Sequence, residues 1–108
     1  FPLTAAQQRT YNRWLAEQAH ARGLGAFLKN DLAQTAQLVG NFDGLIVEEC
    51  YAYSECGLTK PFQAAGKAIL AAEYRGTLTA SRCANALSRG MSLIKKRLNL
   101  DASRQSCF

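Results

Sequence analysis

Short apolar runs recur along the chain, and each is followed by polar or charged residues. The four runs are Gly25–Leu28, Leu45–Val47, Ala68–Ala72 and Met91–Ile94. Short, nearly continuous apolar runs are typical of strands that are buried on both faces, as in a parallel sheet. The pattern therefore predicts four parallel strands.

Helical patterns lie before and between these runs. Thr4 and Gln7 have the spacing of a capping box, which predicts a helix that begins there and ends at Gly23. Apolar residues at three- and four-residue steps form one stripe along this helix, and we expect the stripe to face the core. The stripe consists of Tyr11, Trp14, Leu15 and Ala19.

Three further helical segments are predicted between the strands. Asp31 and Gln34 form a second possible capping box, opening a helix that runs to about Val39. Residues 62–65 allow at most a turn or two, and a longer helix spans about 78–89 and stops at Gly90. Strands that alternate with helices indicate an α/β fold with crossover connections.

Acidic residues follow three of the four apolar runs. The carboxyl ends of parallel strands share one edge, and in a barrel this rim carries the ligand and catalytic residues. No glycine-rich fingerprint follows a strand, which weakens a dinucleotide-binding interpretation. We therefore predict an α/β fold that is half of a (β/α)8 TIM barrel, with a small doubly wound sheet as the alternative.

The charge balance is basic but does not indicate a nucleic-acid binder. The 108 residues include 13 Lys and Arg against 8 Asp and Glu, a net charge of +5. The basic residues are spread along the chain, with Lys95–Arg97 as the one cluster, and Tyr51 and Tyr53 lie among acids. Stacking of bases would need aromatic residues among cations.

Targeting signals are absent from the sequence as given. No apolar run approaches the roughly 18 residues that a membrane helix needs. No charged segment followed by an apolar one marks a signal peptide. Because the sequence begins with Phe1 and not with Met, we expect it to be a processed or cut piece of a longer chain.

The cysteines favour disulfides over a metal site. Four cysteines allow three pairings. No pair has the C-x2-C spacing of zinc ligands, and the single histidine, His20, lies in a helix pattern. We expect no metal, two disulfides and an oxidising compartment outside the cytoplasm. The four residues are Cys50, Cys56, Cys83 and Cys107.

The acids at the predicted rim suit acetal cleavage. Hydrolysis of a glycosidic bond takes one carboxyl group that donates a proton and another that acts as nucleophile or base. Strand alternation sends Glu48 and Glu49 to opposite faces, and the sequence leaves open which face is inward. The candidates by position are Asp31, Glu48, Glu49, Glu55 and Glu73.

Successive blocks of the chain carry a resemblance to a known family. They are Leu28–Asp31, Phe42-Asp43, Glu48–Cys56 (EECYAYSEC), Pro61-Phe62, Ala65–Lys67, Glu73-Tyr74 and Leu100–Cys107. In this order they resemble glycoside hydrolase family 114 from Phe1 to the end of the chain. The resemblance implies a TIM barrel and endo-α-1,4-polygalactosaminidase activity on galactosamine-rich polysaccharide, with two carboxylates and no metal or cofactor.

The resemblance also implies roles for individual residues. Glu48 matches the family's acidic residue before the cysteine and is expected to be the general acid/base, with Glu49 and Glu73 as the alternatives. The resemblance also favours the disulfides Cys50–Cys56 and Cys83–Cys107. Expected sugar contacts are Asn30, Asp31, Tyr51, Glu73 and Tyr74.

One family feature is missing from the sequence. The second catalytic carboxylate is expected in an aspartate-rich strand end before the Phe1–Thr4 entry. The chain is thus expected to be the C-terminal half of a secreted enzyme, from the helix after strand four through strand eight. Alone it would be inactive and would self-associate through its exposed sheet edges.

Three other interpretations stay open. The chain could be a non-catalytic sugar-binding module that uses Tyr51, Tyr53 and Tyr74 as platforms. It could be a complete, disulfide-stapled interaction domain, which would unfold cooperatively as a monomer. Binding of an anionic polymer is the third, with strong salt dependence as its mark.

Overall fold

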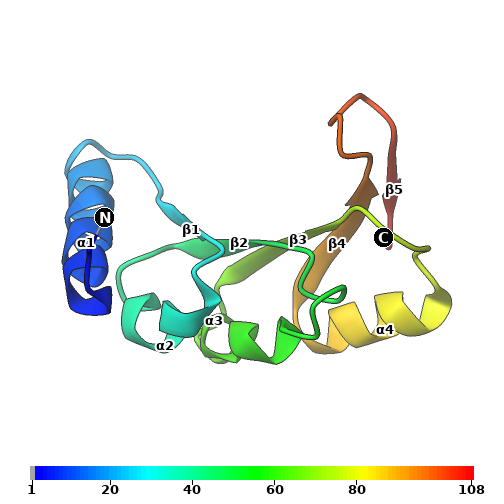
Figure 1. Cartoon of the computed structure of the whole chain (residues 1–108), viewed down its shortest axis with the longest axis horizontal. Helices are drawn as coiled ribbons and strands as arrows, with labels where there is room; N and C mark the ends of the chain where they lie inside the picture. The colour runs from blue at the N-terminus through cyan, green and yellow to red at the C-terminus, as the bar shows by residue number, and fades with distance from the viewer. Residues whose placement is uncertain (1) are drawn as a thin grey trace.

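A computed structural model describes residues 2–108, which form one five-stranded sheet with helices on one of its faces (Figure 1). The strands lie in the order β1-β2-β3-β4-β5, and the first four are parallel. The predicted strands are therefore confirmed. Their bounds are Phe27–Lys29 (β1), Gly44–Glu48 (β2), Ala68–Glu73 (β3), Met91–Lys96 (β4) and Arg104–Ser106 (β5).

The predicted helices are also present. Gly23 and Gly90, both with positive φ, follow the ends of the first and last of them, as expected. The α-helices are Ala5–Ala21 (α1), Thr35–Leu38 (α2), Lys60–Ala64 (α3) and Ala80–Ser88 (α4). Two 3-10 turns, Leu32–Gln34 (η1) and Cys56–Thr59 (η2), precede α2 and α3.

The fifth strand was not predicted. β5 pairs with β4 in the antiparallel direction, with Lys96 opposite Arg104 and Ile94 opposite Ser106. Its three residues are polar and exposed, so they carry no apolar pattern that would identify a strand. The disulfide Cys83–Cys107 joins the residue after β5 to α4.

The core lies between the sheet and the helices α2, α3 and α4. Alternate residues of β2, β3 and β4 point toward these helices and are buried, among them Leu45, Ile69 and Leu93. Phe62 of α3 and Leu38 of α2 are completely buried against them. This two-layer packing fixes the strands whose ends carry the candidate site.

The opposite face of the sheet is apolar but uncovered. Leu70 of β3 is 44% exposed, and a shallow cavity of about 230 Å³ on this face is lined by Ile46, Leu70, Ala72, Ile94 and their neighbours. In Figure 1 the helices α2, α3 and α4 lie on the other side of the sheet and α1 stands beside β1, so no helix covers this face. Apolar residues on both faces explain why the strands appear as continuous apolar runs in the sequence.

The first helix begins as predicted but buries a different side. Thr4 and Gln7 form the capping box. The expected core position of Trp14 is wrong, because Trp14 is 52% exposed and stacks on the exposed Tyr11, while Ala16 is the buried residue of α1. The reason is the position of α1, which lies beside β1 at one end of the molecule rather than over the sheet (Figure 1).

Both predicted disulfides are confirmed. Cys50 pairs with Cys56, and Cys83 pairs with Cys107. No helix within residues 2–108 combines the length and the apolar character that crossing a bilayer requires.

Candidate active site

The carboxyl ends of the parallel strands form one rim. β1 is followed by Asn30 and Asp31, β2 ends at Glu48, and β3 ends at Glu73, with Tyr74 next. The parallel register pairs Glu48 with Ala72 and Glu73 with Lys95, so these ends lie at the same edge of the sheet. The prediction that Glu48 and Glu73 share an edge is confirmed.

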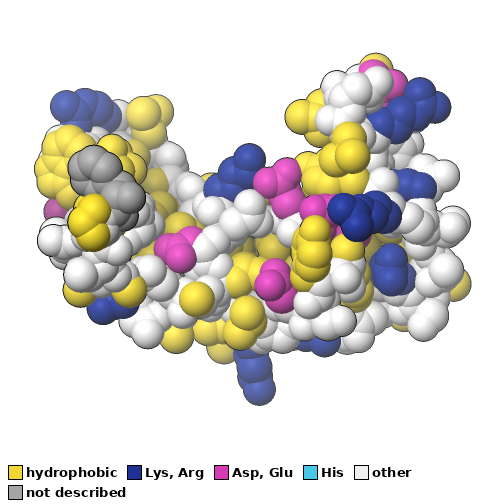
Figure 2. All heavy atoms as spheres, viewed as in Figure 1, with side chains coloured by type: hydrophobic (Ala, Val, Ile, Leu, Met, Phe, Trp, Pro, Cys, Tyr) yellow, Lys and Arg dark blue, Asp and Glu magenta, His cyan; other side chains and the backbone are white. Residues whose placement is uncertain are grey.

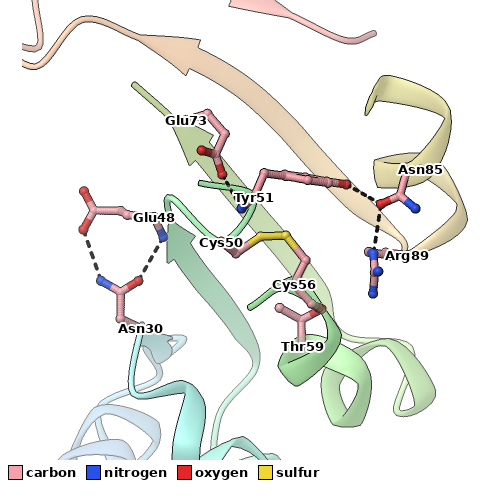
Figure 3. Close-up of a disulfide and its surroundings, with 9 residues drawn as sticks. All are labelled: Asn30, Glu48, Cys50, Tyr51, Cys56, Thr59, Glu73, Asn85 and Arg89. Carbon is pink, nitrogen blue, oxygen red and sulfur yellow. Dashed lines mark hydrogen bonds between the residues drawn. A yellow bond between two sulfur atoms is a disulfide. The ribbon is translucent and has the colours of Figure 1, made fainter. Parts of the chain in front are cut away.

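Glu48 is held by donors from both neighbouring strands. The Asn30 side chain accepts the Glu48 backbone N–H at 2.9 Å and donates through Nδ2 to Glu48 Oε1 at 3.1 Å (Figure 3). The Tyr74 hydroxyl donates to Glu48 Oε2, and Lys29 Nζ lies 3.3 Å from Oε1. Both carboxylate oxygens are therefore engaged.

These contacts set the ionisation of the pair. The hydrogen bond from Tyr74, followed by the one from Asn30, holds the pKa of Glu48 below its ordinary value. The same bond to the Glu48 carboxylate raises the pKa of Tyr74 to about 12. Glu48 is thus an anion and Tyr74 a neutral donor at neutral pH.

Glu48 opens onto a groove at the rim. The groove has a volume of about 510 Å³ and contains three carboxyl groups, those of Asp31, Glu48 and Glu55. The Tyr53 ring, 57% exposed, forms part of its wall. Asn30, Leu32, Ala33 and Leu58 complete the lining. An open, negatively charged groove with an aromatic ring suits a polar, cationic ligand.

Asp31 lines the groove and does not cap a helix. It lies at the start of η1, but its side chain makes no capping hydrogen bond, so the predicted Asp31–Gln34 capping box is wrong. The backbone of Asn30 and Asp31 is left-handed, with φ of 56° and 52°, which turns the Asp31 carboxyl toward Asn12 of α1. Partial burial raises the pKa of Asp31.

Glu73 and Tyr51 lie on the helix side of the sheet. Glu73 follows the buried Ile69 and Ala71 in alternation and is 1% exposed. Its Oε1 accepts the backbone N–H of Tyr51 at 2.8 Å. The Tyr51 hydroxyl donates to Asn85 of α4, so the ring points away from Glu48 (Figure 3). The rim therefore brings Asn30, Asp31, Glu48 and Tyr74 together and separates Glu73 and Tyr51 from them.

The loop after β2 is anchored at several points behind Glu48. The Cys50–Cys56 disulfide closes it, and the Glu55 N–H donates to the Cys50 carbonyl at 2.7 Å. In Figure 3 the disulfide lies in the centre. Glu48 and the Glu73–Tyr51 hydrogen bond are on one side of it, and Thr59 is on the other. These links hold the strand end that carries Glu48.

The three candidates for the general acid/base, Glu48, Glu49 and Glu73, differ in the exposure of their side chains. The Glu48 side chain is 30% exposed at the groove. Glu49 has its Oε1 buried 3.5 Å from Arg75 Nε, and Glu73 is buried beneath the loop. Of the three, Glu48 alone lines the groove.

The contribution of Lys29 to the site was missed from the sequence. Lys29 lies on β1 opposite Ile46, and Ile46 is two residues before Glu48 on β2. A single sequence does not reveal which residues of neighbouring strands lie opposite each other. Residues 2–108 contain no group of three or more His, Cys, Asp or Glu that could hold a metal ion.

Comparison with known proteins decides the family. The family model described as glycoside hydrolase family GH114 matches residues 1–108. The chain belongs to this family. The crystal structure of Aspergillus fumigatus Ega3 in complex with galactosamine is similar, with 29% sequence identity and a TM-score of 0.84. No curated protein sequence matches the chain.

The extent of the match fits the predicted architecture. It covers 97% of this chain and 47% of the Ega3 chain, so the chain spans about half the length of the solved relative. The fold of this family GH114 chain is therefore α/β and corresponds to half of a TIM barrel, as predicted.

Proposed function

We propose that the chain forms part of the active site of an endo-α-1,4-polygalactosaminidase and that Glu48 is its catalytic carboxylate. The family makes the chain part of a glycoside hydrolase. The Ega3 structure contains galactosamine, which supports a galactosamine-containing substrate. The observation that carries the proposal is the Glu48 carboxylate, which is fixed by three donors and open to an acidic groove.

The charge of the groove fits such a polymer. A free amino sugar is cationic at neutral pH and would be repelled by a molecule of net charge +5. Within the groove, however, Asp31, Glu48 and Glu55 supply a local negative field. A cleft focuses the field of the charges that line it, so the groove attracts the amine in spite of the net charge.

The role of Glu48 as general acid/base requires a second carboxylate. An acid catalyst must carry a proton when it meets the glycosidic oxygen. Tyr74, Asn30 and Lys29 favour the ionised form of Glu48 instead. A second carboxylate nearby would raise the Glu48 pKa, because two like charges at short range resist joint ionisation. We propose that a segment outside these 108 residues supplies it.

The other rim residues take different parts in this proposal. Asn30, Asp31 and Tyr74 share the Glu48 side of the rim and are proposed to contact the sugar. Tyr51 and Glu73 are proposed to act as positioning residues, because their hydrogen bonds anchor the loop behind Glu48. Two disulfides are consistent with secretion, which we propose as the location.

The test compares the chain alone with a complete barrel. The barrel is made by joining residues 1–108 to the part of Ega3 that they do not match. We expect the complete barrel to hydrolyse α-1,4-linked galactosamine oligomers, and the chain alone to bind them with little or no turnover. Measurable turnover by the chain alone would refute the need for a second segment. Binding without cleavage by the complete barrel would favour a non-catalytic module.

A further inference from the structure

The positive charge of the chain is concentrated toward its C-terminal end. Residues 74–108 contain seven Lys and Arg and one acid, Asp101, whereas residues 1–73 contain six basic and seven acidic residues. The net charge is therefore +6 after residue 73 and −1 before it, which accounts for the total of +5. The basic residues are dispersed along the sequence, but the net positive charge belongs to the C-terminal end of the chain.

The fold gathers four of these cations around one pocket. The ends of β4 and β5 enclose a volume of about 220 Å³ that is lined by Lys95, Lys96, Arg97 and Arg104 together with Ser103 and Gln105. We call the four cations the β4–β5 basic patch. Figure 2 shows Lys and Arg side chains gathered on this side of the molecule, at the right of the view.

The patch continues toward α4. Lys95 Nζ donates to the Gly76 carbonyl, so the loop after β3 lies against the end of β4. Arg82 Nη1 lies 3.8 Å from the position that a Cβ atom on Gly76 would occupy. Arg82 therefore extends the cationic surface along one side of the molecule.

The pairing within the patch is unfavourable for the isolated protein. Lys96 lies directly opposite Arg104 in the antiparallel β4–β5 pair. Like charges in this position destabilise a sheet. Among the ion pairs of residues 2–108, Asp101 neutralises Arg97, and none neutralises Lys95, Lys96 or Arg104. An anion bound in the pocket would relieve this repulsion.

We propose that the β4–β5 basic patch binds an anionic polysaccharide, one that carries carboxylate, sulfate or phosphate groups at intervals along the chain. The galactosamine polymer is cationic and is excluded as the ligand of this patch. The proposal is independent of the proposed function, because it rests on residues outside the groove.

The structure favours a polysaccharide over a nucleic acid. Residues 91–106 contain no aromatic side chain, so the patch offers no ring on which a base could stack. The Tyr51 ring beside α4 is covered by Arg82, whose Cζ lies 5.0 Å from the ring centroid. Two disulfides fit an oxidising compartment outside the cytoplasm and nucleus, away from most cellular nucleic acid.

A lipid surface is the other occupant that the test must distinguish. Leu98 and Leu100, in the turn between β4 and β5, are 74% and 63% exposed beside the cations. Anionic lipid is concentrated in the cytoplasmic leaflet, which a disulfide-bonded protein does not meet. Vesicles therefore serve as a competing probe.

The experiment measures the affinity of the 108-residue chain for polygalacturonate fragments over a series of salt concentrations. The patch variant carries Lys96→Gln, Arg97→Gln and Arg104→Gln. The control variant carries Arg9→Gln, Arg22→Gln and Lys60→Gln, which remove the same charge elsewhere on the surface. Thermal unfolding of each variant checks that the fold is kept.

We expect the wild-type Kd to increase with salt, and the patch variant to bind about tenfold more weakly at low salt with a shallower salt dependence. The control variant should stay within about twofold of wild type, because local rather than net charge decides binding. If the patch variant fails to fold, Arg104→Gln alone, on the exposed β5, should still weaken binding about threefold.

Several results would overturn the proposal. Equal losses in the patch and control variants would mean that net charge alone is responsible. Absence of polygalacturonate binding at low salt would show that the β4–β5 basic patch is not a binding site for an anionic polysaccharide. Tighter binding of a 20-base-pair DNA duplex, or of phosphatidylserine vesicles, through the same residues would replace the polysaccharide with that partner.

Discussion

Glu48 takes its ionisation state from hydrogen bonds rather than from burial. Tyr74 and Asn30 approach from the strands on either side, and Lys29 adds a positive charge at 3.3 Å. A single side chain at the end of β2 thus depends on the register of three strands. Any shift of one strand against its neighbour would disrupt the site.

The hydrogen bond from the Tyr74 hydroxyl to Glu48 stabilises the fold over a defined pH range. The pKa of Glu48 lies below 4.5 in the folded chain, so its contribution to stability is present above 4.5 and lost as the pH falls through the lowered value. The pKa of Tyr74 rises from 10.0 to about 12, so its contribution is present below 10 and lost as the pH approaches 12.

Tyr74→Phe removes the bond, so the pKa of Glu48 should rise toward its ordinary value, as carbon-13 NMR titration of the carboxyl would detect. The variant should differ most from wild type in free energy of unfolding between about pH 5 and pH 10, with the difference shrinking at both ends. A constant difference across this range, or an unmoved Glu48 pKa, would contradict the assignment.

The loop between β2 and η2 depends on one buried carboxylate. Glu73 is 1% exposed and accepts the Tyr51 N–H. Glu73→Ala would leave that N–H without its acceptor and should cost about 1–3 kcal/mol of unfolding free energy. Glu73→Gln keeps an oxygen acceptor and is the matched control, with a smaller expected loss.

Urea unfolding measures both variants, and hydrogen exchange at the Tyr51 amide reports the local effect. Exchange should accelerate in Glu73→Ala far more than in Glu73→Gln. If both variants lose equal stability, the negative charge of Glu73 rather than its hydrogen bond is what the loop requires.

The sequence predicted the parallel strands and the rim, because strand runs and the acids after them are local signals. It could not predict which face each acid would take. Alternation groups Glu73 with Ile69 and Glu48 with Ile46, but both faces of the sheet are apolar, so hydrophobicity does not distinguish them.

The other differences have similar causes. The stripe of Tyr11 and Trp14 has the correct period for a buried helix face, yet the part of α1 that meets the molecule is the side of Ala16. β5 is held by pairing with β4 and by the Cys83–Cys107 disulfide, and neither is visible as a pattern in its own residues.

The whole molecule carries a local acidic groove in a nearly neutral N-terminal part and a basic patch in its positively charged C-terminal part. The groove with Glu48 lies at the ends of β1 and β2, and the β4–β5 basic patch lies at the other side of the sheet. The sheet face that carries Ile46, Leu70 and Ile94 lies between them, and the molecule is hollowed on this side (Figures 1 and 2). This arrangement separates the proposed cationic substrate from the proposed anionic polysaccharide.

We expect the 108-residue chain to self-associate through its open sheet face. Leu70, 44% exposed in the middle of that face, lies among apolar neighbours. Exposed apolar surface of this kind favours association. Sedimentation should detect dimers or larger species that Leu70→Glu reduces, whereas Leu87→Glu, on the exposed surface of α4, should not. A monomer at all concentrations would contradict this expectation.

The most direct test is Glu48→Gln in the complete barrel formed with the unmatched part of Ega3. The expected result is a loss of kcat/KM on galactosamine oligomers of about 100-fold or more, with unchanged thermal unfolding. Glu49→Gln and Glu73→Gln, measured beside it, should retain most of the activity. An unchanged rate in Glu48→Gln would move the catalytic role to Glu49 or Glu73 and contradict the site described above.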